Sequence, residues 1–195
     1  MEYDLLGWPP DGPKLRLDHE RFSYAGKFVM TNTGKAVARD ATDKGDTDES
    51  DGNGPVADPP IVAAIAFNED RTDATTLWLR YVTVAGDRRG EGIGPELVAF
   101  TRDRALERGY ERLRIAVNNP FAYEALYRAG FGYTGATTGI AELILEYPRP
   151  EDWTNQREAY QRGLEEFHER DLSVEEESFL ESRADSDPPT LERTE

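Results

Sequence analysis

The chain has 195 residues, of which 39 are Asp or Glu and 23 are Lys or Arg, so its formal net charge at pH 7 is −16. A protein that binds nucleic acid through its phosphates needs a basic face, and this balance therefore excludes that class of partner. It also disfavours anionic membrane surfaces. The 37% of hydrophobic residues suffices for one core. Because no apolar run approaches a membrane span and the amino terminus does not resemble a signal peptide, we expect a cytoplasmic protein.

Two residue counts narrow the chemistry. The chain has no cysteine and only two histidines, His19 and His168, which excludes disulfides, thiolate catalysis and Cys-ligated zinc, and we expect no metal site. Only four of the 23 cations are lysines, so 23 − 4 = 19 are arginines. A lysine-poor surface rich in carboxylates resembles that of proteins from salt-accumulating archaea, and it predicts a halophilic protein. An ordinary acidic protein is the alternative.

The first predicted elements are strands. The alternation in Lys27–Thr33 predicts a strand or a hairpin that ends before Gly34. Residues 40–60 are acidic, punctuated by Gly and Pro and almost free of large apolar side chains, which predicts a disordered loop. The apolar runs Ile61–Phe67 and Thr76–Val84, rich in β-branched and aromatic residues, predict two further strands.

Helices and strands alternate after this point. Apolar positions within residues 95–108 recur at helical spacing and predict a helix. Pro95 stands at its start, where a helix accepts proline, and Gly109 follows its end. Residues 113–117 predict a strand, residues 121–129 a short helix and residues 141–147 a final strand. This order predicts an α/β domain with a parallel crossover, which we place in residues 1–150.

The carboxy-terminal region has a different character. Residues 151–171 predict an amphipathic helix whose apolar stripe consists of Trp153, Tyr160, Leu164 and Phe167. Packing of this stripe against the rest of the domain is one interpretation, and a homodimer or partner interface is the other. The last residues, 173–195, are acidic and predict a disordered tail.

A glycine-rich turn lies between the strand at 76–84 and the helix at 95–108. The sequence Arg-Arg-Gly-Glu-Gly-Ile-Gly-Pro of residues 88–95 allows the backbone to curl so that several N–H groups point into one concavity, which can bind an anion. Pro95 and Leu97 rule out a dinucleotide fingerprint, and the chain has no phosphate-binding loop ending in Gly-Lys-Ser/Thr. From this motif alone, a tight turn without a ligand remains the alternative.

Two motifs together are more specific. The pattern R-x-x-G-x-G occupies residues 89–94, four residues beyond the strand. The pattern N-x-x-A, then seven further residues and G-F, occupies residues 119–131. In this order and spacing the motifs resemble the GNAT superfamily of acyl-CoA-dependent N-acyltransferases, over about residues 60–147. The resemblance implies a GNAT-like mixed β-sheet with splayed central strands flanked by helices, and a carboxy-terminal helix follows it in this chain.

The resemblance also implies how acetyl-CoA binds. The pantetheine arm would pair with the backbone of Val82 and Val84, and the N–H of Val84 would polarise the thioester carbonyl. The remaining cofactor-binding residues that it implies are Arg89, Gly90, Glu91, Gly92, Ile93, Gly94 and Asn119.

The family's general acid has no direct counterpart. Members commonly carry a tyrosine four residues before the G-F pair, where this sequence has Leu126. Tyr127 is adjacent, about 100° around a regular helix, and we predict it as the acid that protonates the departing thiolate. A role in the core is the alternative for this tyrosine.

The family's general base is also missing, because the fourth strand offers Arg80 in its place. An amine with a pKa near 7.8 is about 15% neutral at pH 7, whereas a lysine side chain is about 0.04% neutral, so weakly basic acceptors are favoured. The sequence therefore predicts an N-acetyltransferase acting on a small-molecule or peptide amine. A non-catalytic acyl-CoA-binding module of the same fold is the alternative.

Overall fold

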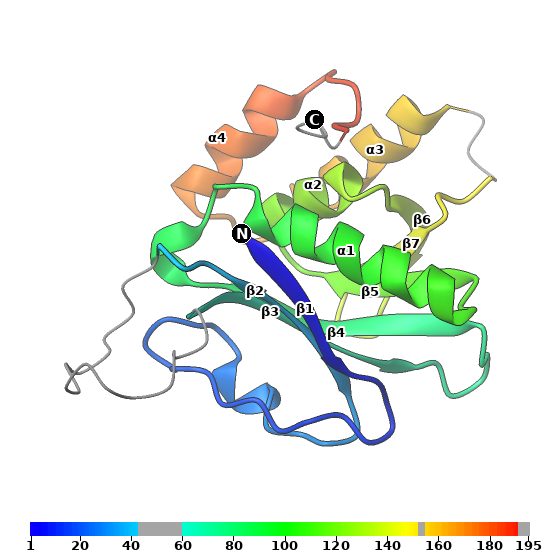
Figure 1. The fold of residues 1–195 in the computed structure, drawn as a ribbon. Coiled ribbons are helices and arrows are strands. Elements are labelled where there is room, and N and C mark those ends of the chain that lie inside the picture. Colours follow the sequence, from blue (N-terminus) through cyan, green and yellow to red (C-terminus); the bar gives the residue numbers. More distant parts are fainter. Residues whose placement is uncertain (43–59, 152–154, 191–195) are drawn as a thin grey trace. The chain divides into compact units, whose positions relative to one another are not determined.

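The computed structural model describes residues 1–42, 60–151 and 155–190. Its strands form a mixed sheet in the order β1-β2-β3-β4-β5-β7-β6 (Figure 1). The strands are β1 (Glu2–Gly7), β2 (Gly34–Arg39), β3 (Ile61–Glu69), β4 (Thr76–Val84), β5 (Arg112–Val117), β6 (Gly132–Thr137) and β7 (Leu143–Tyr147). The helices are α1 (Ile93–Arg108), α2 (Pro120–Arg128), α3 (Gln156–Glu165) and α4 (Val174–Arg183), with short 3-10 turns η1 (Ala25–Lys27) and η2 (Gly86–Arg88).

The chain divides into two compact units. Unit 1 consists of residues 1–68 and 81–101, and unit 2 consists of residues 69–80 and 102–195. Strand β4 and helix α1 each contribute residues to both units. Each unit has its own buried side chains.

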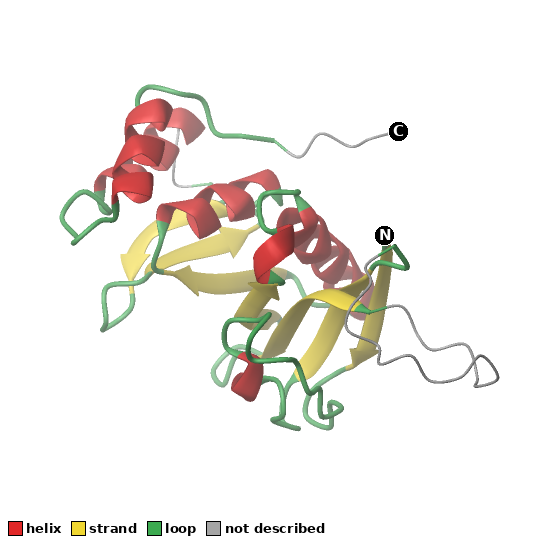
Figure 2. Cartoon of the chain, turned by 90° about the vertical axis from the view of Figure 1, so that its left-hand side faces the viewer, coloured by secondary structure: helices red, strands yellow, loops and turns green. Residues whose placement is uncertain are grey.

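Unit 1 is built on the antiparallel strands β1, β2 and β3. Small and apolar side chains from these strands pack with Phe28, which reaches the core from the long connection between β1 and β2. Figure 2 draws one short helical turn, η1, among the loops of this region. In its described residues this connection contains no α-helix.

The strand predicted at Lys27–Thr33 is wrong, because β2 begins only at Gly34. Phe28 is fully buried, whereas Val29 and Met30 are exposed. The alternation therefore reflects one anchoring side chain in a loop and no hydrogen-bonded ladder. The disordered loop predicted for residues 40–60 falls mostly on residues 43–59, which lie outside the described residues.

Unit 2 contains the crossover that the sequence predicted. The first half of β4 pairs in parallel with β5, in a register that joins Thr76 to Arg112 and Leu79 to Ile115. Strand β7 then pairs antiparallel with β5 and β6. The predicted strands and helices between residues 76 and 147 are confirmed to within about two residues at their ends, and the sequence analysis missed β1, β2 and β6.

The apolar stripe of α3 packs inside unit 2. Tyr160 stacks on Tyr123 of α2 with ring centroids 5.7 Å apart, and Phe167 meets the same ring edge-on. A Cβ at Gly163 would lie 2.0 Å from the Tyr123 hydroxyl oxygen, so only glycine allows this close approach of α3 to α2. The predicted packing of the stripe is confirmed for its described members; Trp153 lies outside the described residues, and a homodimer stays a prediction.

The disordered tail predicted at 173–195 is wrong for residues 174–183, which form α4. Ser173 and Glu176 make a reciprocal capping box at its start, which satisfies two backbone donors. At its end Arg183 pairs with Glu124 of α2, a side chain that is almost fully buried. Local capping and this long-range ion pair outweigh the acidity on which the prediction rested.

We expect Glu124→Gln to lower the free energy of unfolding by about 1.5–3 kcal/mol, the usual contribution of hydrogen bonds to a charged group. Burial raises the pKa of Glu124, but hydrogen bonds from Arg183 and Arg128 outweigh it, so the pKa is lowered overall. The carboxylate therefore stabilises the fold above its unfolded pKa, and this contribution is lost as the pH falls through the folded pKa. Urea unfolding at pH 7 and in acid should show the difference between variant and parent shrinking in acid.

The matched control for this prediction is Glu107→Gln. Glu107 pairs with Arg104 on the exposed face of α1, where such pairs contribute little. Equal losses of stability in the two variants, or a Glu124 effect that persists in acid, would contradict a specific role of the Glu124 ion pair.

Candidate functional site

The turn from β4 into α1 has an unusual backbone conformation. Gly90 and Gly92 have φ angles of +87° and +83°, in the left-handed region that side chains rarely adopt. A Cβ built on either glycine meets nothing within 4 Å, so both face open space. Glycine is required here by backbone conformation, and the space beside the turn is open to a ligand.

The same turn leaves a row of backbone donors unpaired. Within the described part of the chain, none of the five N–H groups from Gly90 to Gly94 donates a hydrogen bond to a protein group. These donors precede or begin a helix of 16 residues, whose dipole is positive at this end. Unpaired N–H groups at a helix N-terminus suit an anion, and the anion-binding role that the sequence analysis gave this turn stays a prediction.

The two arginines of the turn differ in their contacts. Arg88 pairs with Asp40 and Glu91, at 2.9 and 2.8 Å between nitrogen and oxygen, so its charge is already neutralised. Hydrogen bonds from Thr42 and then from Arg88 hold the pKa of Asp40 well below its usual range. Arg89, in contrast, is exposed and donates to the neutral Ser23 hydroxyl at 2.8 Å. Its cation is therefore the one available to an anion at this turn.

The end of β4 lies directly beside the first turn of α1. A Cβ at Gly94 would be in ordinary contact, at 3.4 Å, with a methyl group of Val84. Val82 and Val84 are half-buried, while Thr83 between them is buried with its hydroxyl unpaired in the described structure. Unit 1 thus brings together Val82, Val84 and all the predicted residues from Arg89 to Gly94. The pantetheine pairing and the polarising N–H of Val84 stay predictions.

Unit 2 holds the two remaining predicted site residues. Asn119 is the N-cap of α2, and its side-chain oxygen accepts the N–H of Ala122 at 2.9 Å. This contact gives Asn119 a structural role, and its contact with the cofactor stays a prediction.

Tyr127 lies in the aromatic core of unit 2. Its side chain is 0% exposed and packs against Tyr160, with the guanidinium of Arg149 over its ring. The hydroxyl accepts the backbone N–H of Tyr133 at 3.0 Å and lies 3.4 Å from the hydroxyl of Tyr123. Burial raises the pKa of Tyr127 above its ordinary value. These contacts favour the core role that the sequence analysis left open, and they leave the general-acid prediction to an experiment.

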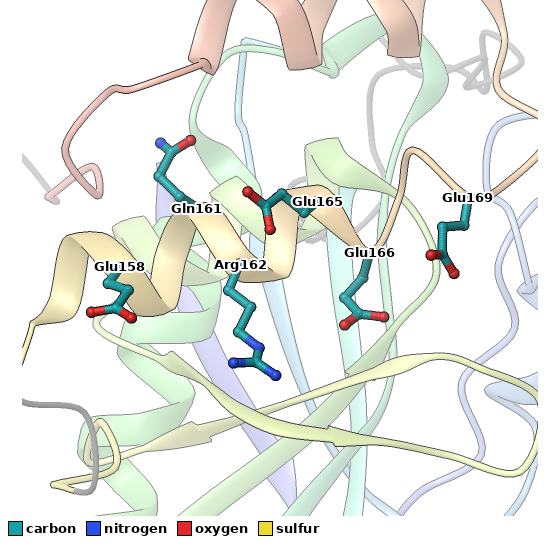
Figure 3. Close-up of a pocket in the computed structure, with 6 residues that line it drawn as sticks. All are labelled: Glu158, Gln161, Arg162, Glu165, Glu166 and Glu169. Atoms are coloured by element: carbon teal, nitrogen blue, oxygen red, sulfur yellow. The ribbon is translucent and has the colours of Figure 1, made fainter.

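A hollow lies along the exposed side of α3 (Figure 3). It measures about 460 Å³ and is lined by Glu158, Gln161, Arg162, Glu165, Glu166 and Glu169. With four glutamates and one arginine it would repel the phosphates of a cofactor. The described residues contain no group of three or more His, Asp or Glu side chains that could hold a metal ion, and no helix among them is apolar and long enough to cross a membrane.

Comparisons with known proteins agree with this geometry. The model of the acetyltransferase (GNAT) family matches residues 28–133, a span that includes β4, the glycine turn and α2. No curated protein matches the chain.

Many solved structures resemble the chain at low identity. Nourseothricin acetyltransferase is 23% identical and has a TM-score of 0.45, with 60% of this chain and 66% of that chain covered. A GCN5-related N-acetyltransferase from Kribbella flavida is 21% identical and has a TM-score of 0.45, and the match covers 60% of this chain and 67% of that chain. A ribosomal-protein-alanine N-acetyltransferase from Brucella melitensis is 20% identical and has a TM-score of 0.43, and the match covers 58% of this chain and 67% of that chain.

Proposed function

We propose that this protein, which belongs to the acetyltransferase (GNAT) family, transfers an acetyl group from acetyl-CoA to an amine. The observation that carries the proposal is the row of unpaired N–H groups from Gly90 to Gly94, in a turn held open by two glycines of positive φ. A pyrophosphate offers several anionic oxygens to such a turn, and each charge-assisted hydrogen bond to a backbone N–H is stronger than a neutral one.

The proposed reaction is a direct attack. The neutral amine nitrogen bonds to the thioester carbonyl carbon, the carbon–sulfur bond breaks, and sulfur takes the electron pair. The proton lost by the nitrogen balances the thiolate, so the products are an amide and free coenzyme A. Positioning and polarisation of the carbonyl, which we assign to the N–H of Val84, supply most of the rate.

The charges of the turn support backbone recognition of the cofactor over recognition by a basic patch. Arg88 is occupied by Asp40 and Glu91, which leaves Arg89 as the cation that meets the phosphates. We therefore expect acetyl-CoA affinity to depend more on the shape of the turn than on the total charge of its arginines.

The experiment is release of free thiol from acetyl-CoA, followed with a panel of amines in molar KCl and alongside acetyl-CoA binding by calorimetry. The proposal expects binding together with thiol release that depends on the amine. Absence of acetyl-CoA binding by the folded protein would overturn it.

The alternative is an acyl-CoA-binding module without catalysis. Arg80 at the base position and the buried, hydrogen-bonded hydroxyl of Tyr127 favour this second function. Tight binding without thiol release on any amine would support the module over the enzyme.

A further inference from the structure

The longest stretch of the sequence without a carboxylate runs from residue 21 to residue 39. Carboxylates make up one residue in five of the whole chain, 39 of 195. This stretch instead carries four cations: Arg21, Lys27, Lys35 and Arg39. Its formal charge is therefore opposite to that of the chain as a whole.

Three of these four cations have protein partners. Lys35 is buried and donates to backbone carbonyls at 2.6 and 3.0 Å. Arg39 and Arg21 each lie against an aspartate, at 3.0 and 3.8 Å between nitrogen and oxygen. Lys27 is exposed, and its ammonium lies 6.0 Å from the ring centre of Tyr81 on β4. In the described chain, no carboxylate is within ion-pair distance of Lys27.

Lys27 belongs to an aromatic patch of unit 1. The ring of Tyr24 lies 5.9 Å from that of Tyr81, and Phe28, at 6.5 Å from Tyr81, anchors the segment in the core. Tyr24 is 55% exposed, and the neighbouring Val29 and Met30 add exposed apolar surface. We call Tyr24, Lys27 and Tyr81 the Tyr24 patch.

The backbone of Tyr24 is in the left-handed region, with φ 61° and ψ 15°. For a residue with a side chain this conformation costs about 1–2 kcal/mol, a cost that glycine avoids. Its side chain is largely exposed, so the surrounding core gains little from a tyrosine here. Strain of this kind is concentrated at ligand-binding positions.

Thr83 provides an independent observation on the same face of β4. Side chains two residues apart on a strand point to the same face, which places Thr83 beside Tyr81. Its side chain is 4% exposed, and its hydroxyl has no hydrogen-bond partner in the described structure. An unpaired buried hydroxyl is uncommon in native proteins, and it places a polar group beneath the surface directly beside the patch.

We propose that the Tyr24 patch binds the acceptor and that the acceptor is an aromatic amine carrying a carboxylate, an inference that rests on the proposed function. The planar ring packs on Tyr24, and the carboxylate pairs with Lys27. Tyr81, the member of the patch on β4, lies three residues before Val84, about 10 Å along the strand. An acceptor packed on Tyr81 can therefore extend its amine along β4 toward the carbonyl that we assign to Val84.

The absence of a carboxylate base agrees with this class of acceptor. An aromatic amine is neutral at pH 7, because its lone pair is delocalised into the ring. It therefore attacks the thioester without prior deprotonation. The nitrogen bonds to the acetyl carbon, sulfur leaves with the electron pair, and the proton from nitrogen balances the thiolate to give an anilide and coenzyme A.

The test uses 4-aminobenzoate and aniline, which share the ring and amine and differ in the carboxylate. We expect Lys27→Gln to raise the Kd of 4-aminobenzoate about fivefold or more and to leave the affinities for aniline and acetyl-CoA unchanged. Lys14→Gln, an exposed lysine outside the carboxylate-free stretch, is the matched control. Tyr24→Gly removes the ring while relieving the backbone, so 4-aminobenzoate binding should weaken about tenfold without loss of melting temperature.

Calorimetry of 4-aminobenzoate without acetyl-CoA separates this inference from the proposed function. If folded protein releases thiol with other amines but does not bind 4-aminobenzoate, the inference is overturned and the acetyltransferase remains. An increased Kd for acetyl-CoA in Lys27→Gln would assign Lys27 to a cofactor phosphate and would also overturn it. Selective loss of 4-aminobenzoate affinity in both variants supports it.

Discussion

Gly92→Glu is expected to weaken acetyl-CoA binding at least tenfold while the far-UV circular dichroism spectrum is retained. Gly92 has a φ of +83°, so any side chain strains the turn, and a carboxylate beside the unpaired N–H groups would compete with the pyrophosphate for them. Its charge also repels the phosphates. A tenfold loss corresponds to about 1.4 kcal/mol, a small part of what several charge-assisted hydrogen bonds provide. Calorimetry with acetyl-CoA measures the change directly.

Gly109→Glu is the matched control for backbone strain. Gly109 follows the end of α1, has a φ of +104° and, like Gly92, has nothing within 4 Å of an added Cβ. Both substitutions should therefore lower the melting temperature, and only Gly92→Glu should lower the affinity. An unchanged Kd in folded Gly92→Glu protein, or equal losses of affinity in the two variants, would remove the glycine turn from the proposed site.

The elements that the sequence predicted are those with strong local signals. The strand at Thr76–Val84 is rich in β-branched and aromatic residues, and α1 is bounded by proline and glycine signals. Strand β6 has the sequence Gly-Tyr-Thr-Gly-Ala-Thr, with Gly135 at a positive φ and an irregular register to β7. Such a strand depends on its partner strand, and local propensity does not reveal it.

Contacts between distant residues account for the rest of what the sequence analysis missed. Helix α4 is fixed by the pair of Arg183 with Glu124, residues 59 positions apart. In the site, Arg88 pairs with Asp40, 48 positions away, and the local sequence of the turn does not reveal this contact. The glycines of the turn were predictable because a backbone at positive φ requires glycine at that position itself. The charge of the turn depends instead on which distant chain segment pairs with its arginines.

The role of Tyr127 depends on such distant contacts too. In the sequence it stands one position from the family's usual acid, and in unit 2 its hydroxyl accepts the N–H of Tyr133. We expect Tyr127→Phe to lower the free energy of unfolding by about 1–3 kcal/mol, because that buried N–H loses its acceptor. The general-acid prediction adds a second effect, a fall in kcat of about 100-fold with little change in acetyl-CoA affinity.

Tyr123→Phe separates the two effects. The Tyr123 hydroxyl donates to the backbone carbonyl of Tyr160 at 3.1 Å, so its removal leaves no N–H unpaired and should cost less stability. Urea unfolding and kcat are compared for both variants at a temperature where each is fully folded. Full kcat in Tyr127→Phe, together with the loss of stability, would exclude the general acid and leave Tyr127 as a packing residue. A 100-fold loss of kcat confined to Tyr127→Phe would require its hydroxyl to exchange the Tyr133 contact for the departing sulfur during turnover.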